Sequence, residues 1–166
     1  MRRKDDAVRI VRAPAPAQTA VVTVTAQPHN ELVEYAHPFV AAYAKYRYRA
    51  GIVESLGVAT YELLGNAVSY SAVFSPVELQ VVETPASVAV GVSNDTVQVR
   101  LDILCAHLER VNKDPEGTFL EEMRRSMSGD SARPMLGLAR VVHEAKLSLD
   151  VYVSGKRVTL FARASK

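Results

Sequence analysis

A long apolar stretch between Gly51 and Ser71 constrains this chain more than any other part of it. Its apolar side chains go almost all the way round a helix, which is typical of a helix buried in a core. They are Ile52, Val53, Leu56, Val58, Ala59, Leu63, Leu64, Ala67 and Val68. Glu62 and Asn66 interrupt the stretch four residues apart, so they lie on one face, one turn apart.

A buried carboxylate is costly unless it is paired, hydrogen-bonded or bound to a metal. Two interpretations of Glu62 and Asn66 therefore follow. Either the two side chains form a metal-and-phosphate site on a core helix, or the helix is amphipathic and both side chains face water.

The composition indicates one domain held together without disulfides. A chain of 166 residues can form one domain with a full core. No apolar run is long enough to cross a bilayer, and no apolar signal region follows the charged first residues, so we expect a cytoplasmic protein with no membrane partner. The single cysteine, Cys105, excludes an internal disulfide and a multi-cysteine zinc site. It falls on a helical apolar stripe, where we expect a small buried hydrophobe.

The charge pattern gives little support to nucleic-acid binding. The net charge of +2 comes from 20 basic and 18 acidic residues. Beyond the cluster Arg2–Lys4 there is no basic stripe of the kind that tracks a phosphate backbone. Binding through that short cluster is kept only as a minor alternative.

The rest of the pattern predicts an α+β domain. Residues 1–18 are expected to be a flexible N-terminal arm, because alternating prolines between Ala13 and Ala17 disfavour helix and central strand. A short edge strand is expected within the arm at Val8–Val11. Further strands are predicted at Ala20–Thr25 and in two hairpins, at 77–92 and 147–162, where apolar and polar residues alternate.

Helical spacing predicts the other elements. These are helices near residues 30–46, 51–71, 101–111, 119–127 and 135–146, with loops at 112–117 and 128–134. His37-Pro38 should kink or break the first helix. The sequence therefore predicts a two-layer α+β sandwich, with a mixed or antiparallel β-sheet and helices on one face.

This order of elements resembles the GHKL fold, the ATP-binding domain of gyrases, heat-shock chaperones, histidine kinases and mismatch-repair ATPases. In size it is most similar to single-domain anti-sigma-factor serine kinases. The family motif Glu-x-x-x-Asn-Ala is matched by Glu62-Leu63-Leu64-Gly65-Asn66-Ala67. The resemblance implies a histidine-kinase-like ATPase domain over residues 19–166, with Glu62 as the catalytic residue and Asn66 as the magnesium ligand. Magnesium prefers oxygen ligands, and a carboxylate one turn away can orient a water or a hydroxyl.

The family's adenine motif, Asp-x-Gly, is only partly matched. Asn94, Asp95 and Thr96 stand in its place. The amide of Asn94 can still accept a hydrogen bond, although without charge. Asp95 comes one residue later, so in a strand it would point to the other face.

Two further motifs of the family are echoed near the C-terminal end. The phosphate loop Gly-x-Gly-Leu is reduced to Gly137-Leu138, because Met135 stands where the first glycine belongs. A helix N-terminus remains there, and its free amides suit a phosphate. Thr159, which follows Gly155 in the last hairpin, corresponds to the final Gly-then-Thr motif. We expect Asn66, Asn94 and Gly137 to converge on one cleft, with residues 128–134 as a lid.

The resemblance leaves two functions open. The first is an ATP- and Mg²⁺-binding regulatory protein of the anti-sigma type, acting as a protein serine/threonine kinase or ATPase. Its partner would be a sigma factor, an anti-anti-sigma-like protein or another signalling protein, and a homodimer is also expected. The second is a degenerate GHKL-fold interaction module with weak or no nucleotide binding. The eroded motifs predict weak or absent ATP binding and slow phosphoryl transfer.

Overall fold

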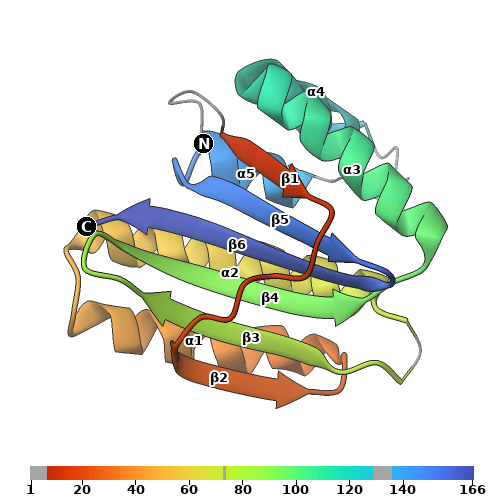
Figure 1. Cartoon of the computed structure of the whole chain (residues 1–166). Helices are drawn as coiled ribbons and strands as arrows, with labels where there is room; N and C mark the ends of the chain where they lie inside the picture. Colours follow the sequence, from red (N-terminus) through yellow and green to blue (C-terminus); the bar gives the residue numbers. More distant parts are fainter. Residues whose placement is uncertain (1–6, 73, 129–135) are drawn as a thin grey trace.

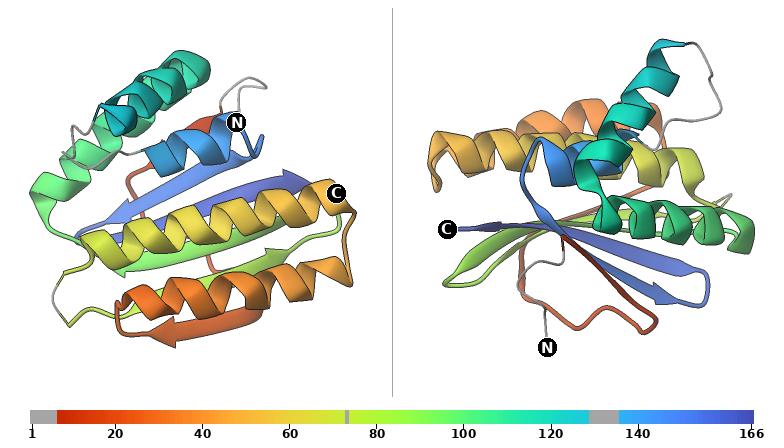
Figure 2. Two further views of the ribbon diagram at one scale, coloured as in Figure 1. Left: turned by 180° about the vertical axis from the view of Figure 1, so that it is seen from behind. Right: turned by 90° about the horizontal axis from the view of Figure 1, so that it is seen from above.

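The structure is a computed structural model, and it describes residues 7–72, 74–128 and 136–166. In chain order its elements are β1 Val8–Val11, β2 Ala20–Ala26, α1 Asn30–Lys45, α2 Ala50–Tyr70, β3 Val77–Glu83, β4 Ser87–Asp95, α3 Gln98–Lys113, α4 Pro115–Met127, α5 Leu136–His143, β5 Ser148–Ser154 and β6 Arg157–Ser165. The strands form a sheet, and the described helices all lie on one of its faces (Figures 1 and 2). The predicted two-layer α+β sandwich is therefore confirmed.

The sheet has six strands in the order β1-β5-β6-β4-β3-β2. The two predicted hairpins are β3–β4 and β5–β6, and the antiparallel pairing of β4 with β6 joins them into one sheet. At one edge, β1 pairs with β5 in parallel, so the sheet is mixed. The edge strand expected at Val8–Val11 is thus present.

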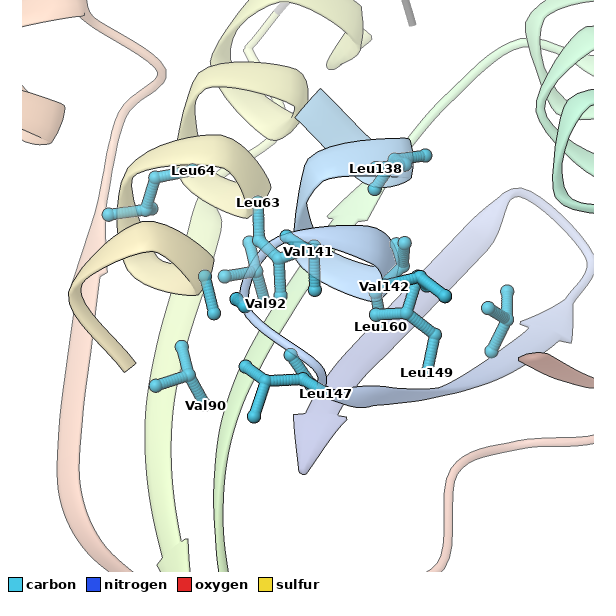
Figure 3. Close-up of a cluster of buried hydrophobic side chains, with 14 of the residues drawn as sticks. Leu63, Leu64, Val90, Val92, Leu138, Val141, Val142, Leu147, Leu149 and Leu160 are labelled. Carbon is cyan, nitrogen blue, oxygen red and sulfur yellow. The ribbon is translucent and has the colours of Figure 1, made fainter. Parts of the chain in front are cut away.

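Helix α2 lies against the middle of the sheet, as its apolar residues predicted (Figure 1). Leu63 and Leu64 are buried above Val90 and Val92 of β4, in a cluster that also includes Val141 of α5 (Figure 3). Helix α2 contributes side chains to the core through most of its length, and α1 and α5 pack beside it.

Residues 12–19, here called the strap, run across the face of the sheet that carries no helices (Figure 1). The strap leads from β1 at one edge to β2 at the other edge. Ala15 packs there against a small buried cluster that includes Tyr152 and Phe161. The alternating prolines therefore serve an extended crossing that needs no ladder hydrogen bonds.

Three local expectations need correction. Of the kink or break expected at Pro38, the break is wrong, because α1 is one helix from Asn30 to Lys45. The loop expected at 112–117 is instead a sharp junction, where Asp114 caps α4 by accepting a hydrogen bond from the backbone of Gly117 at 2.9 Å. Strand β4 continues to Asp95, beyond the predicted end of its hairpin, because β6 pairs with it that far.

Most of the predicted lid, 128–134, lies outside the described residues, as does Met135. Among the described residues, no helix combines the length and the apolar content that a membrane span requires.

Candidate functional site

Glu62 and Asn66 both line a hollow of about 670 Å³ on the outer side of α2. The described residues around it come from α1, from the second half of α2 and from the start of α5. They are Asn30, Val33, Glu34, Tyr61, Glu62, Gly65, Asn66, Ser69, Tyr70 and Gly137. The helical spacing of Glu62 and Asn66 therefore places them together, and the packing of α5 beside α2 adds Gly137.

Asn66 brings an unused hydrogen-bond donor to this hollow. Its Nδ2 atom is buried and has no partner among the described residues. An unpaired buried amide costs about 1–3 kcal/mol, so such a group in a native fold calls for an explanation. A ligand oxygen bound in the hollow would supply the missing acceptor.

Glu62 is held by an ion pair. Its Oε1 atom accepts a hydrogen bond from Arg140 Nη1 at 2.6 Å, and its side chain is only 15% exposed. Arg140 also donates to Glu144 at 2.9 Å, one turn further along α5. Burial raises the pKa of the Glu62 carboxyl, and the neighbouring Arg140 opposes this shift. A carboxyl in a cleft can act in proton transfer, but one oxygen of this carboxyl is already engaged by Arg140.

Gly137 sits against the second oxygen of Glu62. A Cβ atom at position 137 would lie 2.3 Å from Glu62 Oε2. A side chain at position 137 would therefore displace the Glu62 carboxylate, so glycine suits the close packing of α5 against Glu62. Leu138, the next residue, is fully buried in the core and is not among the described residues that line the hollow.

The residues expected at adenine do not join this group. Asn94 is buried on the helix side of β4, and its Nδ2 donates to the backbone oxygen of Asp95 at 3.3 Å. It is not among the described residues that line the hollow. Asp95 points to the opposite face, as its position predicted, and forms an ion pair with Arg157 at 3.4 Å.

Thr159 also lies on the face without helices. Its hydroxyl is 2.9 Å from that of Ser93, its direct neighbour across the β4–β6 pair. The sheet therefore separates Thr159 from Asn66. Of the predicted site residues, the structure brings together Glu62, Asn66 and Gly137 and leaves Asn94, Asp95, Thr159 and the Leu138 side chain apart from them.

The sequence alone did not identify Arg140, the residue that forms an ion pair with Glu62. The two lie 78 positions apart in the chain. An arginine one turn before a glutamate on a short helix is typical of a solvated ion pair, so no sequence signal linked it to α2.

A magnesium ion could be held here only with help from its ligand. Among the described residues, no group of three or more His, Cys, Asp or Glu side chains is placed to bind a metal. Magnesium accepts one or two protein oxygens when phosphates and waters supply the rest. The Asn66 amide oxygen fits that role, whereas the surroundings of Asn94 do not fit an adenine that shares the hollow.

Neither protein-family models nor curated proteins give a match to this chain.

Proposed function

We propose that this chain is a GHKL-like regulatory protein of the anti-sigma, serine-kinase type that binds ATP and Mg²⁺ weakly in the hollow beside α2. One observation carries the proposal: the buried, unpartnered amide of Asn66 shares the hollow with Glu62 and Gly137. A phosphate group with its magnesium ion needs both an acceptor and a donor, and one amide side chain offers both.

In this proposal Asn66 contacts the ion and phosphate, and Glu62 faces the attacking hydroxyl of a partner protein. Glu62 can take the proton of that hydroxyl only through the oxygen that Arg140 does not hold. Phosphoryl transfer should therefore be slow. The buried free cysteine, Cys105, agrees with the further proposal that the protein works in the reducing cytoplasm.

A second candidate is an interaction module of the same fold that binds no nucleotide. The Glu62–Arg140 ion pair favours it, because it satisfies the carboxylate without any ligand. The position of Asn94 outside the hollow also favours it. Loss of a charged adenine contact typically costs about 1.5–3 kcal/mol, or roughly a 10- to 100-fold loss of affinity.

Calorimetry with ATP and Mg²⁺ separates the two candidates. The proteins to compare are the intact chain, Asn66→Ala, and Glu54→Ala as a control, because Glu54 is an exposed residue of α2 outside the hollow. We expect weak binding that falls by at least about tenfold in Asn66→Ala and is unchanged in Glu54→Ala. Thermal melting should show that Asn66→Ala remains folded.

The opposite result would defeat the nucleotide proposal. If the intact chain gives no heat at millimolar-range ATP, or if Asn66→Ala binds as well as the intact chain, the hollow is not an ATP site. The module without nucleotide would then be the better account of the fold.

A further inference from the structure

The strap crosses the face of the sheet that carries no helices (Figure 1), and a second hollow of about 400 Å³ lies between the two. None of its described lining residues also lines the hollow beside α2. Small-molecule sites typically have volumes of about 300–1,000 Å³. The second hollow is near the lower end of that range, so it suits one small ligand rather than a polymer.

The sheet side of this hollow is a row of polar side chains from neighbouring strands. Ser93 of β4 lies directly opposite Glu78 of β3 on one side and Thr159 of β6 on the other. All three residues line the hollow. Neighbouring strands are about 4.8 Å apart, so one small ligand can reach two or three members of the row at once.

The two hydroxyl groups of this row are buried and only partly used. Ser93 and Thr159 are each 7% exposed, and their hydroxyl oxygens are 2.9 Å apart. The pair has two hydroxyl hydrogens, and the bond between the two oxygens uses one of them. No other group in the described part of the chain forms a hydrogen bond with either hydroxyl. One buried hydrogen is therefore left for an acceptor in the hollow.

The strap covers this row without bonding to it. Its residues 13–18 form no hydrogen bond with the sheet within the described ranges. Where the strap packs directly on the sheet, Ala15 lies against the apolar cluster of Tyr152 and Phe161. A strap that served only as a cover would favour apolar residues beneath it throughout, because buried polar groups without full partners are costly.

The charges around the hollow are already compensated. Its described lining contains one carboxylate, Glu78, and one guanidinium, Arg157. Glu78 accepts a hydrogen bond from Gln80 Nε2 at 2.8 Å, and Arg157 pairs with Asp95 at 3.4 Å. Most of the remaining polar lining consists of neutral hydroxyl and amide groups. Such a lining favours a neutral ligand with several hydroxyl groups over a phosphate.

The hollow also has an apolar part. The ring of Phe161 rests on Gly91, where a Cβ atom would lie 2.3 Å from the ring. Phe161 lines the hollow together with Ala13 and Pro14 of the strap. A sugar ring carries hydroxyls around its edge and C–H groups on its faces. It therefore matches a lining in which polar groups lie beside alanine, proline and an aromatic ring.

We propose that the hollow under the strap binds a neutral polyhydroxylated ring of the size of a monosaccharide. In this site Ser93 and Thr159 exchange hydrogen bonds with ligand hydroxyls, and the Glu78 carboxylate accepts from a further one. The proposal goes beyond the ATP proposal and does not depend on it, since the sheet separates the two hollows.

Saturation-transfer difference NMR on the full chain tests the proposal, with glucose, galactose and myo-inositol as probes. We expect at least one of them to bind with a dissociation constant in the millimolar range or below. Ser93→Ala/Thr159→Val should raise that constant by at least about tenfold, because the ligand loses both hydroxyl partners. The control Thr23→Val removes a hydroxyl from an exposed position of β2 outside the hollow and should bind as wild type.

Thermal melting shows whether the double variant is folded. Replacing both partners of a buried hydrogen bond by apolar groups of similar shape is nearly neutral, so we expect its melting temperature to stay close to that of wild type. A loss of sugar binding without a loss of stability would separate a binding role of the pair from a structural one.

Two further comparisons define the ligand and the site. Glucose 6-phosphate should bind no more tightly than glucose, because the hollow offers no uncompensated positive charge. Asn66→Ala should bind the sugar as wild type does, so this proposal and the ATP proposal can fail separately. If none of the three probes binds at tens of millimolar, or if the double variant binds as well as wild type, the proposal is wrong and the hollow holds only water.

Discussion

Gly137 has no room for a side chain, and this makes it the sharpest single-residue test of the site. In Gly137→Ala the new Cβ would lie 2.3 Å from Glu62 Oε2, so it would displace the carboxylate whose Oε1 pairs with Arg140. We expect the free energy of unfolding to fall by about 1–2 kcal/mol, since a partly buried ion pair loses its geometry. Chemical denaturation would measure the loss.

Gly65 supplies the matched control on α2. A Cβ atom there meets nothing within 4 Å. Alanine is better than glycine inside a helix, so Gly65→Ala should stabilise the protein by roughly 0.5–1 kcal/mol. If Gly137→Ala behaved like Gly65→Ala, the close packing of α5 on Glu62 would not matter for stability.

The carboxylate of Glu83, at the end of β3, accepts hydrogen bonds from several side chains. Tyr43 and Arg47 Nε each donate to its Oε1 at 2.9 Å, and the Tyr48 hydroxyl also donates to that oxygen. Burial alone would raise the pKa of Glu83. The hydrogen bonds from Arg47, Tyr48 and Tyr43 outweigh burial and lower the pKa to about 2.

This shift predicts a specific loss of stability in acid. The folded pKa of Glu83 lies below its ordinary value of 4.5, so the contribution is present above pH 4.5 and is lost as the pH falls toward 2. At neutral pH, Glu83→Gln should lower the free energy of unfolding by about 1–2 kcal/mol. Denaturation at several pH values should show the difference from wild type shrinking below pH 4.5.

Glu121→Gln is the control for this acid effect. Glu121 also lies beside two arginines, Arg110 and Arg125, but its side chain is 47% exposed. Exposed ion pairs contribute about 0–1 kcal/mol, so this variant should show little change at any pH. A Glu83→Gln effect that stayed constant from neutral pH to pH 2 would contradict the prediction.

At the scale of single residues, the sequence predicted part of the candidate site. The four-residue spacing of Glu62 and Asn66 was sufficient to place both on one face, because helix geometry fixes that relation. The partner of Glu62 could not be predicted, since Arg140 reaches it only through the packing of α5 on α2. The resemblance placed Thr159 and Asn94 at one site, but they point to opposite faces of the sheet, which depends on strand register.

Among the elements, helix α1 contains a proline, Pro38, whose replacement should not harm the regular helix. Pro38 lies inside the helix on its exposed side, while Ala36, Val40 and Ala44 are buried. Burial of that apolar face holds the helix together despite the missing backbone donor. Proline in a helix interior costs about 3 kcal/mol, so Pro38→Ala should stabilise the protein by about 1–2 kcal/mol. Thermal melting would measure this.

Ala42→Pro would be the matched opposite change, one turn further along the exposed side of α1. It should destabilise the protein by a similar or larger amount. Equal melting temperatures for wild type and Pro38→Ala would mean that the proline fits α1 without strain.

Element boundaries followed from the sequence where a local signal existed. The alternating strands of both hairpins and the apolar length of α2 identified these elements. The junction at Asp114-Pro115 was mistaken for a loop because Asp and Pro are common in turns. The same pair is also a helix cap followed by a proline in the first turn, and packing of α4 decides between the two.

For the molecule as a whole, the strap determines how well the second face of the sheet is covered. Ala15 packs toward Tyr152 and Phe161, whereas Ala17 is exposed. Ala15→Asp would place a charge against this apolar cluster and should lower the free energy of unfolding by about 1–2 kcal/mol. Ala17→Asp should change it by less than about 0.5 kcal/mol. Urea denaturation of both variants checks the prediction, and equal values would mean that the strap contributes little.

The arrangement of the layers was predictable, but the order of strands was not. Two alternating hairpins and a buried helix require a sheet with helices on one face. Nothing in the four residues of β1 indicates a parallel partner, because a short edge strand carries too little pattern to identify one. The path of the strap across the sheet follows from this pairing, so the sequence could not predict it either.

The pairing of β1 has a consequence for how the protein is made. Arg9 of β1 bonds to Asp150 of β5, 141 residues later in the chain. During synthesis β1 leaves the ribosome before any other described strand. The strand with which it pairs, β5, is synthesised only much later. Contacts between such distant residues form late, because a long loop must close first. Until β1 and β5 pair, β5 has an unpaired strand edge and the apolar side of β1 is exposed. During this interval the nascent chain is most prone to aggregation and most in need of a chaperone.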